Sequence, residues 1–255
     1  MLVPTRSKLS RLSGVLKLKY AVMAIKRPTH VVQYLKSLRV ETELEQAPAR
    51  LASLCSKTRS DIDGYFDEIE SDDEFIEVFH SRWDELNETG RGSTPPAEAR
   101  VLYALCRAVE PETVVVSGAG YGGFDAHIAN ALEKNGHGEL HSIDLPKERG
   151  DYECGYAVPE YLRHRWNLHL EDAKTSLPQL LQTNDVDLFL HDSNHSDEWM
   201  RWEFSQAHKY LDQDSYVASH DVLHNFAWTD FVSEHSLPNT RVITTGIAST
   251  SSDRY

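Results

Sequence analysis

The sequence predicts an α/β protein, in which helices cover both faces of a doubly wound, mostly parallel sheet of six or seven strands. From Pro95 onward, short apolar runs alternate with segments of helical periodicity, which is the pattern of successive β-α-β units. The first apolar run begins at Val114 and leads through a glycine-rich turn directly into a helix. That combination is typical of Rossmann-like domains. An N-terminal helical extension is expected before this domain.

The chain begins with a basic, amphipathic segment. Residues 1–40 contain nine lysines and arginines and no acid. Within residues 7–25, apolar side chains share one helical stripe, and the basic residues lie mostly off it; the stripe consists of Leu9, Leu12, Leu16, Tyr20 and Met23. One interpretation is a helix that lies on an anionic membrane surface. The other is a helix packed on the domain or on a second subunit of a homo-oligomer.

Further helices are expected over residues 31–38, 44–55, 61–70 and 73–86. The last two place aromatic residues at the spacing of a buried face, namely Tyr65, Phe66, Phe75, Phe79 and Trp83. The stretch 87–96 is rich in glycine and proline and interrupts the helical pattern. We therefore divide the chain into a helical extension, residues 1–93, and a main domain, residues 94–255.

The main domain alternates between helices and strands. The expected helices span residues 97–109, 124–135, 159–165, 173–183, 197–211 and 226–235. The expected strands span residues 114–117, 139–144, 166–170, 186–191 and 215–220, with a last single strand near 241–245. Ligands of such sheets bind beyond the carboxyl ends of the strands, so the residues that close each strand are the candidates for a site.

The turn after the first strand is the first candidate. Its residues Gly118, Ala119, Gly120 and Gly122 allow the backbone to reverse sharply and to approach a ligand without an intervening Cβ. The helix that follows offers unpaired N–H groups to polar ligand atoms. We expect these four residues to bind a cofactor.

Acidic residues follow the second and third strands. Asp144 closes the second strand, where a carboxylate can accept hydrogen bonds from a ribose diol; the alternative is a helix cap or turn aspartate. Asp172 follows the third strand and could cap the next helix or accept a bond from an adenine amino group. These two roles of Asp172 are compatible.

Histidines and aspartates gather after the fourth and fifth strands, within residues 191–196 and 220–225. Carboxylate oxygens suit hard cations such as Mg²⁺, whereas an imidazole ligand favours Mn²⁺, Fe²⁺ or Zn²⁺. A surplus histidine, His195 or His224, could be a general base. The alternative is that these side chains only cap loops.

Composition narrows the function classes. The formal net charge of -14 argues against nucleic acid as the main partner. The three cysteines are widely spaced and form no Cys-x-x-Cys motif, so they indicate neither a disulfide framework nor a cysteine zinc site. This use of cysteine is consistent with a protein of the reducing cytoplasm. No apolar run reaches the length of a membrane span. A cytoplasmic location is expected, at the inner face of the membrane if the basic helix binds there.

These motifs resemble those of class I S-adenosylmethionine-dependent methyltransferases. The turn 118–122 matches their first motif, and Asp144 matches the acid that closes their second strand. A branch that methylates hydroxyls of small molecules and sugars is more similar still, with segments like residues 158–166, 186–200 and 219–228. The resemblance covers residues 94–246. It implies an enzyme that binds S-adenosylmethionine and methylates an oxygen of a small-molecule or glycan acceptor.

Two positions depart from that family's pattern. Val116 stands where an acid usually precedes the first glycine, and His220 stands where the branch often has the first of two acids. Metal-dependent relatives, such as the catechol and macrolide O-methyltransferases, bind Mg²⁺ through acids at these strand ends. The resemblance therefore makes Asp192 and Asp221, together with His220, candidate ligands of Mg²⁺ or Mn²⁺.

Other functions stay open at this point. Gly118, Gly120 and Gly123, followed by Asp144, also fit the fingerprint of an NAD(P)-dependent oxidoreductase, although hydride transfer does not require the histidine and aspartate cluster. A non-enzymatic scaffold docked on a membrane could also retain the fold. Beyond residue 40, the chain has 17 basic residues against 40 acidic ones. For a methyltransferase, this acidic remainder and the basic N-terminus suggest an acceptor at a membrane surface, such as a sugar of a lipid-linked glycan.

Overall fold

The computed structural model describes residues 39–89, 97–146 and 152–251, and within them one sheet has the strand order β3-β2-β1-β4-β5-β7-β6. Its strands are β1 (Thr113–Ser117), β2 (Glu139–Asp144), β3 (Trp166–Leu170), β4 (Leu188–His191), β5 (Tyr216–Ser219), β6 (Asn239–Val242) and β7 (Thr245–Ser249). The first five strands pair in parallel. The predicted doubly wound α/β fold is confirmed.

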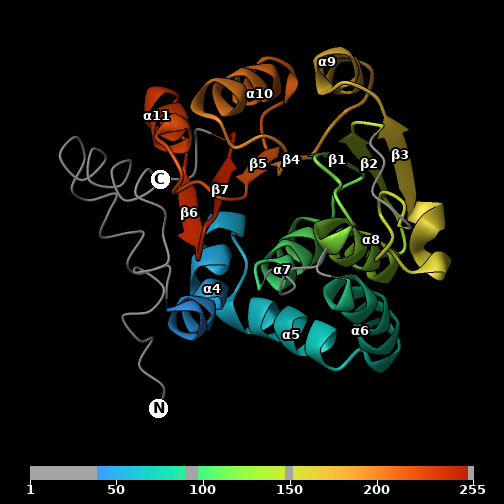
Figure 1. Cartoon of the computed structure of the whole chain (residues 1–255). Coiled ribbons are helices and arrows are strands. Elements are labelled where there is room, and N and C mark those ends of the chain that lie inside the picture. The colour runs from blue at the N-terminus through green and yellow to red at the C-terminus, as the bar shows by residue number, and fades with distance from the viewer. Residues whose placement is uncertain (1–38, 90–96, 147–151, 252–255) are drawn as a thin grey trace, which may run out of the picture.

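Helices form a layer on each side of the sheet (Figure 1). One side carries α4 (Val40–Cys55), α5 (Arg59–Glu70), α6 (Asp73–Glu88), α7 (Ala99–Val109) and α8 (Gly123–Asn135). The other side carries α9 (Ala173–Thr183), α10 (Asp197–Tyr210) and α11 (Ala227–Glu234). A short 3-10 helix, η1 (Glu160–Arg165), leads into β3.

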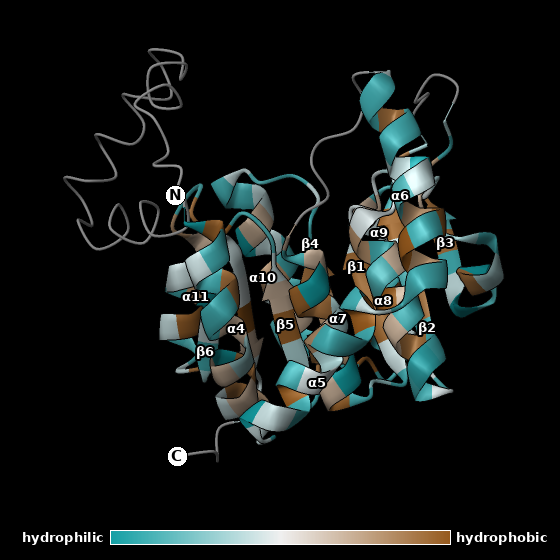
Figure 2. Ribbon diagram, turned by 90° about the horizontal axis from the view of Figure 1, so that it is seen from below, coloured by the Kyte–Doolittle hydropathy of each residue, from teal (hydrophilic) through white to brown (hydrophobic). Residues whose placement is uncertain are grey.

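Every residue of the central strands β1, β4 and β5 is buried, because helices cover both faces of the sheet. Val114 and Val116 of β1 belong to the core under α7 and α8, whereas Val115 belongs to the core under α9, α10 and α11. This alternation follows from the two-residue period of a strand. Figure 2 shows apolar residues along the central strands, between helices whose outer surfaces are largely hydrophilic.

The helix boundaries follow capping chemistry. Thr58 and Asp61 form a capping box at the start of α5, and the Ser196 hydroxyl accepts the Trp199 N–H at the start of α10. The C-terminal end of α8 is set by Gly136, whose φ of 80° is the left-handed conformation that glycine adopts without penalty.

The helical extension shares its core with the main domain. Phe75 and Phe79 of α6 both pack edge-on against His127 of α8, with ring centroids 4.9 and 4.8 Å apart. Burial lowers the pKa of His127 to about 4, so this ring is neutral at pH 7. The predicted aromatic face is therefore core. The predicted segments 7–25 and 31–38 lie outside the described residues, as does most of the boundary at 87–96.

The C-terminal part of the sheet differs from the prediction. A single strand was expected near 241–245, but β6 and β7 form an antiparallel hairpin in which Val242 pairs with Thr245. Ile243 and Thr244 make the turn, and Ile243 has a φ of +54°, a value that is unusual for a β-branched residue. Because both residues of the turn are β-branched, residues 241–245 have the composition of an uninterrupted strand.

None of the described helices is both long enough and apolar enough to cross a membrane.

Candidate functional site

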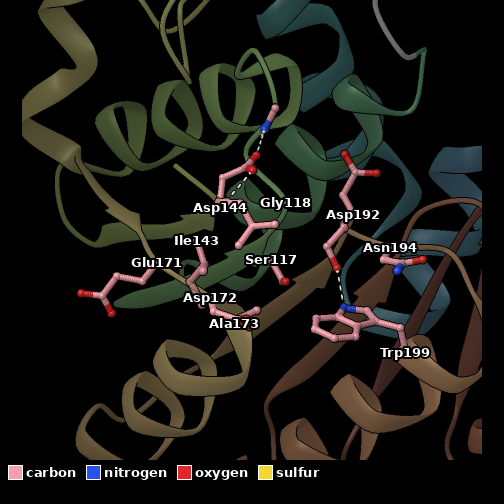
Figure 3. A pocket seen from close by; sticks show the side chains of 13 residues that line it. Ser117, Gly118, Ile143, Asp144, Glu171, Asp172, Ala173, Asp192, Asn194 and Trp199 are labelled. Carbon is pink, nitrogen blue, oxygen red and sulfur yellow. Dashed lines mark hydrogen bonds between the residues drawn. The ribbon is translucent and has the colours of Figure 1, made fainter. Parts of the chain in front are cut away.

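A cavity of about 610 Å³ opens at the carboxyl ends of the parallel strands (Figure 3). It spans β1 and β4, between which the strand order changes direction, and this is where open α/β sheets bind their ligands. Its walls are Ser117, Gly118, Gly120, Ile143, Asp144, Leu145, Glu171, Asp172, Ala173, Asp192, Ser193, Asn194 and Trp199. The predicted cofactor residues Gly118, Gly120, Asp144 and Asp172 are thus brought together.

Three glycines of the turn are needed for different reasons. At Gly118, a Cβ would lie 2.4 Å from the carbonyl oxygen of Asp192, and at Gly122 it would lie 2.8 Å from Val158 Cγ2. At Gly120, which has a φ of +55°, a Cβ would meet no atom within 4 Å. Only Gly118 and Gly120 line the cavity. Gly122 instead permits close packing, and Ala119 is buried beside the turn.

Asp144 joins the turn to the end of β2. Its Oδ2 accepts the Gly120 N–H at 2.8 Å, and its Oδ1 accepts the Leu145 N–H at 2.7 Å. These two bonds fix the orientation of the carboxylate beside the glycine turn. Figure 3 shows it at the edge of the cavity beside Gly118.

Asp172 and Trp199 form the opposite part of the wall. Asp172 caps α9 by accepting the Lys174 N–H at 2.8 Å, so its predicted capping role is confirmed. Trp199 is held through its indole Nε1–H, which donates to Ser193 Oγ at 3.0 Å and to Glu203 Oε1 at 2.7 Å. Leu145, a large apolar side chain that is 41% exposed, also lines the cavity.

The histidine and aspartate cluster adjoins this cavity through Asp192. His220 Nδ1 donates to Asp192 Oδ1 at 2.9 Å, and His195 Nε2 lies 3.7 Å from the same oxygen and 3.5 Å from Asp221 Oδ2. One donor atom from each of Asp192, His195 and His220 lies within 4.8 Å of the other two. The strand ends therefore do converge, as predicted.

The predicted site residues are not equally central. The compact set contains His195 in place of Asp221, although Asp221 Oδ1 is only 3.8 Å from His220 Nε2. His224 lies farther out, with a side chain that is 40% exposed and its Nδ1 3.6 Å from Asp221 Oδ2.

The two histidines nearest Asp192 differ in charge. Burial lowers the pKa of His195 to about 4, against the attraction of Asp221, so the ring is neutral at pH 7. Burial would also lower the pKa of His220, but its hydrogen bond to Asp192 and the charges of Asp192 and Asp221 raise it to about 9. Without another cation in the site, His220 is therefore the positive partner of Asp192 at pH 7.

Sequence reasoning missed two buried residues behind this cluster. His191 Nδ1 lies 2.5 Å from Glu203 Oε2, and both side chains are fully buried. His191 Nε2 lies 3.2 Å from His195 Nδ1. A signal for Glu203 was present, because it shares a helical face with Met200, Phe204 and Ala207, where an unpaired acid would be costly.

Comparison with known protein families gives a match within the main domain. Residues 115–222 match a family described as a methyltransferase domain. None of the curated proteins matches the sequence.

Three solved structures share the fold. The methyltransferase PaMTH1 of Podospora anserina, bound to SAH, has a TM-score of 0.52 and 11% identity over 69% of this chain and 87% of its own. The O-methyltransferase TomG of Streptomyces achromogenes, in complex with SAM, has a TM-score of 0.52 and 16% identity over 69% and 90%. An O-methyltransferase of Bacillus cereus in complex with SAH gives 0.52 and 13% over 69% and 91%.

Proposed function

We propose that the chain is a class I S-adenosylmethionine-dependent methyltransferase that methylates a hydroxyl group of a small molecule or sugar. The match of residues 115–222 to a methyltransferase domain, and the fold shared with solved methyltransferases bound to SAM or SAH, support the proposal. One observation carries the proposal. Asp192 is shared between the cavity suited to the cofactor and the cluster that contains the neutral His195. The proposed cofactor cavity therefore lies next to a side chain that can act as a base.

We assign the cavity to the cofactor, and its walls fit that group. The open space at Gly120 admits a ligand against the backbone, and Asp144 offers its carboxylate to the ribose hydroxyls. Leu145 supplies an apolar surface for the adenine ring, and Asp172 supplies an acceptor for its amino group. When bound, the cofactor supplies a methyl group on a positive sulfur, so the protein's main task is to align the acceptor oxygen with it.

His195 is the proposed general base. Its neutral ring can take the proton of the acceptor hydroxyl, which is a poor nucleophile until that proton leaves. His224, on the outer side of Asp221, is the second candidate, and it can pass the proton on to solvent.

The same cluster can hold a divalent cation. Asp192, His195 and His220 offer donor atoms at short range, with Asp221 beside them. Mixed nitrogen and oxygen donors favour Mn²⁺, Fe²⁺ or Zn²⁺ over Mg²⁺. Such an ion would act as a Lewis acid on the acceptor oxygen. To ligate it through Nδ1, His220 must give up the proton that it shares with Asp192.

Our proposal for the acceptor and its location is based on the basic N-terminus. Residues 1–40 carry nine basic side chains and no acid, which suits a peripheral contact of residues 7–25 with an anionic membrane and an acceptor such as a lipid-linked glycan. Removal of residues 1–27 should abolish binding to anionic vesicles, measured at two ionic strengths because salt screens the attraction. If the full chain ignores such vesicles at moderate salt, the segment packs on protein, in the monomer or in a homo-oligomer.

Calorimetry tests the cofactor assignment. S-adenosylhomocysteine should bind, and NAD⁺ should not; the reverse result would favour an oxidoreductase. Asp144→Asn should weaken S-adenosylhomocysteine at least about tenfold, because it removes a charge-assisted hydrogen bond worth about 1.5–3 kcal/mol. Asp185→Asn is the matched control, since Asp185 is exposed and precedes β4 at the opposite edge of the sheet.

Two further measurements test the chemistry. If the cluster works through a metal, methyl transfer should stop in EDTA and return with Mn²⁺; activity after exhaustive chelation would leave His195 acting alone as the base. Mass spectrometry of glycans and lipids from cells with and without the gene should identify the methylated acceptor.

A further inference from the structure

We propose that Glu203 and His191 are positioning residues that fix the tautomer of His195, so that its Nε2 presents a lone pair to the site. The use of that lone pair in catalysis rests on the proposed function, whereas the tautomer itself does not. Three side chains carry the inference, Glu203, His191 and His195, in a chain that begins on α10 and ends beside Asp192.

The chain starts at a carboxylate whose hydrogen bonds are fully specified. Glu203 Oε1 accepts from Ser117 Oγ at 2.6 Å, from Ser193 Oγ at 2.8 Å and from Trp199 Nε1 at 2.7 Å. Glu203 Oε2 is left for His191 Nδ1 at 2.5 Å. Since an ionised carboxylate only accepts hydrogen bonds, His191 must carry its proton on Nδ1.

The next contact transmits this choice. A neutral imidazole with a proton on Nδ1 is an acceptor at Nε2. His191 Nε2 lies 3.2 Å from His195 Nδ1, so His195 in turn must carry its proton on Nδ1. Both ring nitrogens of the fully buried His191 are thus engaged, Nδ1 by Glu203 and Nε2 by His195.

The chain ends in the site. With Nδ1 protonated, His195 Nε2 has the free lone pair, 3.5 Å from Asp221 Oδ2 and 3.7 Å from Asp192 Oδ1. Its backbone is also held, because Asn225 Nδ2 donates to the His195 carbonyl at 3.0 Å. A general base and a metal ligand both need this lone pair, and a hydrogen bond at the other ring nitrogen selects it.

The substitution Glu203→Gln should reverse the donors and acceptors along this chain of hydrogen bonds, with little change in the shape of the side chain. The amide oxygen can keep the three bonds of Oε1, while the amide NH₂ faces His191 Nδ1 and donates to it. His191 then carries its proton on Nε2 and donates to His195 Nδ1, which leaves His195 with a proton on Nε2 and no lone pair toward the site. Glu198→Gln is the matched control, because Glu198 is an exposed glutamate of the same helix.

Long-range ¹H–¹⁵N spectra of the imidazoles, assigned with a His195→Asn variant, provide the test. In the unaltered protein, His195 should be protonated on Nδ1, and in Glu203→Gln it should be protonated on Nε2. Methyl transfer by Glu203→Gln should fall about 10–100-fold, while the Kd for S-adenosylhomocysteine should change less than about threefold. Glu198→Gln should match the unaltered protein in both readouts.

The possible results separate this proposal from the proposed function. A proton on His195 Nε2 in the unaltered protein, as an imidazolium at His191 would cause, overturns the positioning role even if no variant folds. An unchanged tautomer and full turnover in Glu203→Gln overturn it as well. The expected tautomers in a protein that binds no S-adenosylhomocysteine would support the positioning chain and overturn the methyltransferase assignment of the cavity.

Discussion

At the scale of single residues, the turn after β1 separates packing from binding. A Cβ at Gly118 would strike the backbone of Asp192, whereas a Cβ at Gly120 would enter open space in the cavity wall. We therefore expect Gly120→Val to fold, with a loss of about 1–3 kcal/mol for a branched residue at positive φ, and to weaken S-adenosylhomocysteine more than tenfold by filling the cavity. Calorimetry and urea unfolding measure the two effects.

Gly118→Ala is the companion variant, and it should lose more stability than Gly120→Val despite its smaller side chain. An unchanged Kd in folded Gly120→Val would show that the ligand does not pass over this residue.

Asp125 gives a pH-dependent prediction. Burial raises its pKa to about 7, although Ser142 Oγ and Trp166 Nε1 both donate to its Oδ1. In the unfolded chain this carboxyl ionises near pH 4. Between about pH 4 and pH 7 the unfolded state therefore loses its proton while the folded state keeps it, so the contribution of Asp125 to stability declines as the pH rises through this window.

Asp125→Asn resembles the protonated acid and removes that dependence. The free energy of unfolding of the variant should gain about 3 kcal/mol relative to the unaltered protein between pH 5 and pH 8. Urea unfolding of both proteins at each pH measures the gain, and all other titrating groups cancel in the comparison. Parallel pH profiles would contradict a raised pKa in the folded state.

Residues of the site could be predicted where the signal is local in sequence. The glycines, Asp144 and the acids and histidines after β4 and β5 directly follow their strands, so topology alone brings them to one edge. The link through Glu203 could not be predicted in the same way. It depends on which face of α10 meets the sheet and on the rotamers of His191 and His195.

At the scale of elements, prediction succeeded where period and caps agreed. Among the described residues, the helices and the parallel strands lie within a few residues of the predicted bounds. Several of these helices begin at a side-chain cap, as α5, α9 and α10 do. The hairpin of β6 and β7 was missed because its turn lacks a turn residue. Tertiary contacts hold that turn instead: Glu98 Oε1 accepts the Thr244 N–H at 3.2 Å and the Thr244 hydroxyl at 2.9 Å.

Glu98→Ala should therefore destabilise the protein by about 1–3 kcal/mol, because it leaves donors of the turn without a partner. Glu98→Gln retains the accepting oxygen and should lose less than about 1 kcal/mol. Urea unfolding followed by tryptophan fluorescence compares them. Equal losses in the two variants would mean that the charge of Glu98, rather than its contact with the turn, matters.

At the scale of the whole molecule, we expect the helical extension and the main domain to unfold as one unit. The aromatic face of α6 and the apolar residues of α7 and α8 belong to one core. A fragment of residues 94–255 would uncover Tyr103 and His127, which contact α5 and α6 in the whole chain, so it should aggregate or bind the dye ANS. Deletion of residues 1–38 is the control, since it leaves every described residue in place. A folded, monomeric fragment 94–255 would contradict the shared core.

Arg82 shows what the shared core means for protein engineering. This α6 side chain donates to the carbonyl oxygens of Tyr156 and Val158, both at 2.9 Å, and Val158 is the residue that closes over Gly122. The helical extension thus braces the rear of the glycine turn. A chimaera that exchanges the first hundred or so residues for those of another enzyme, with the aim of changing its acceptor, would also remove this brace, unless the graft places an arginine at the same point of its third described helix.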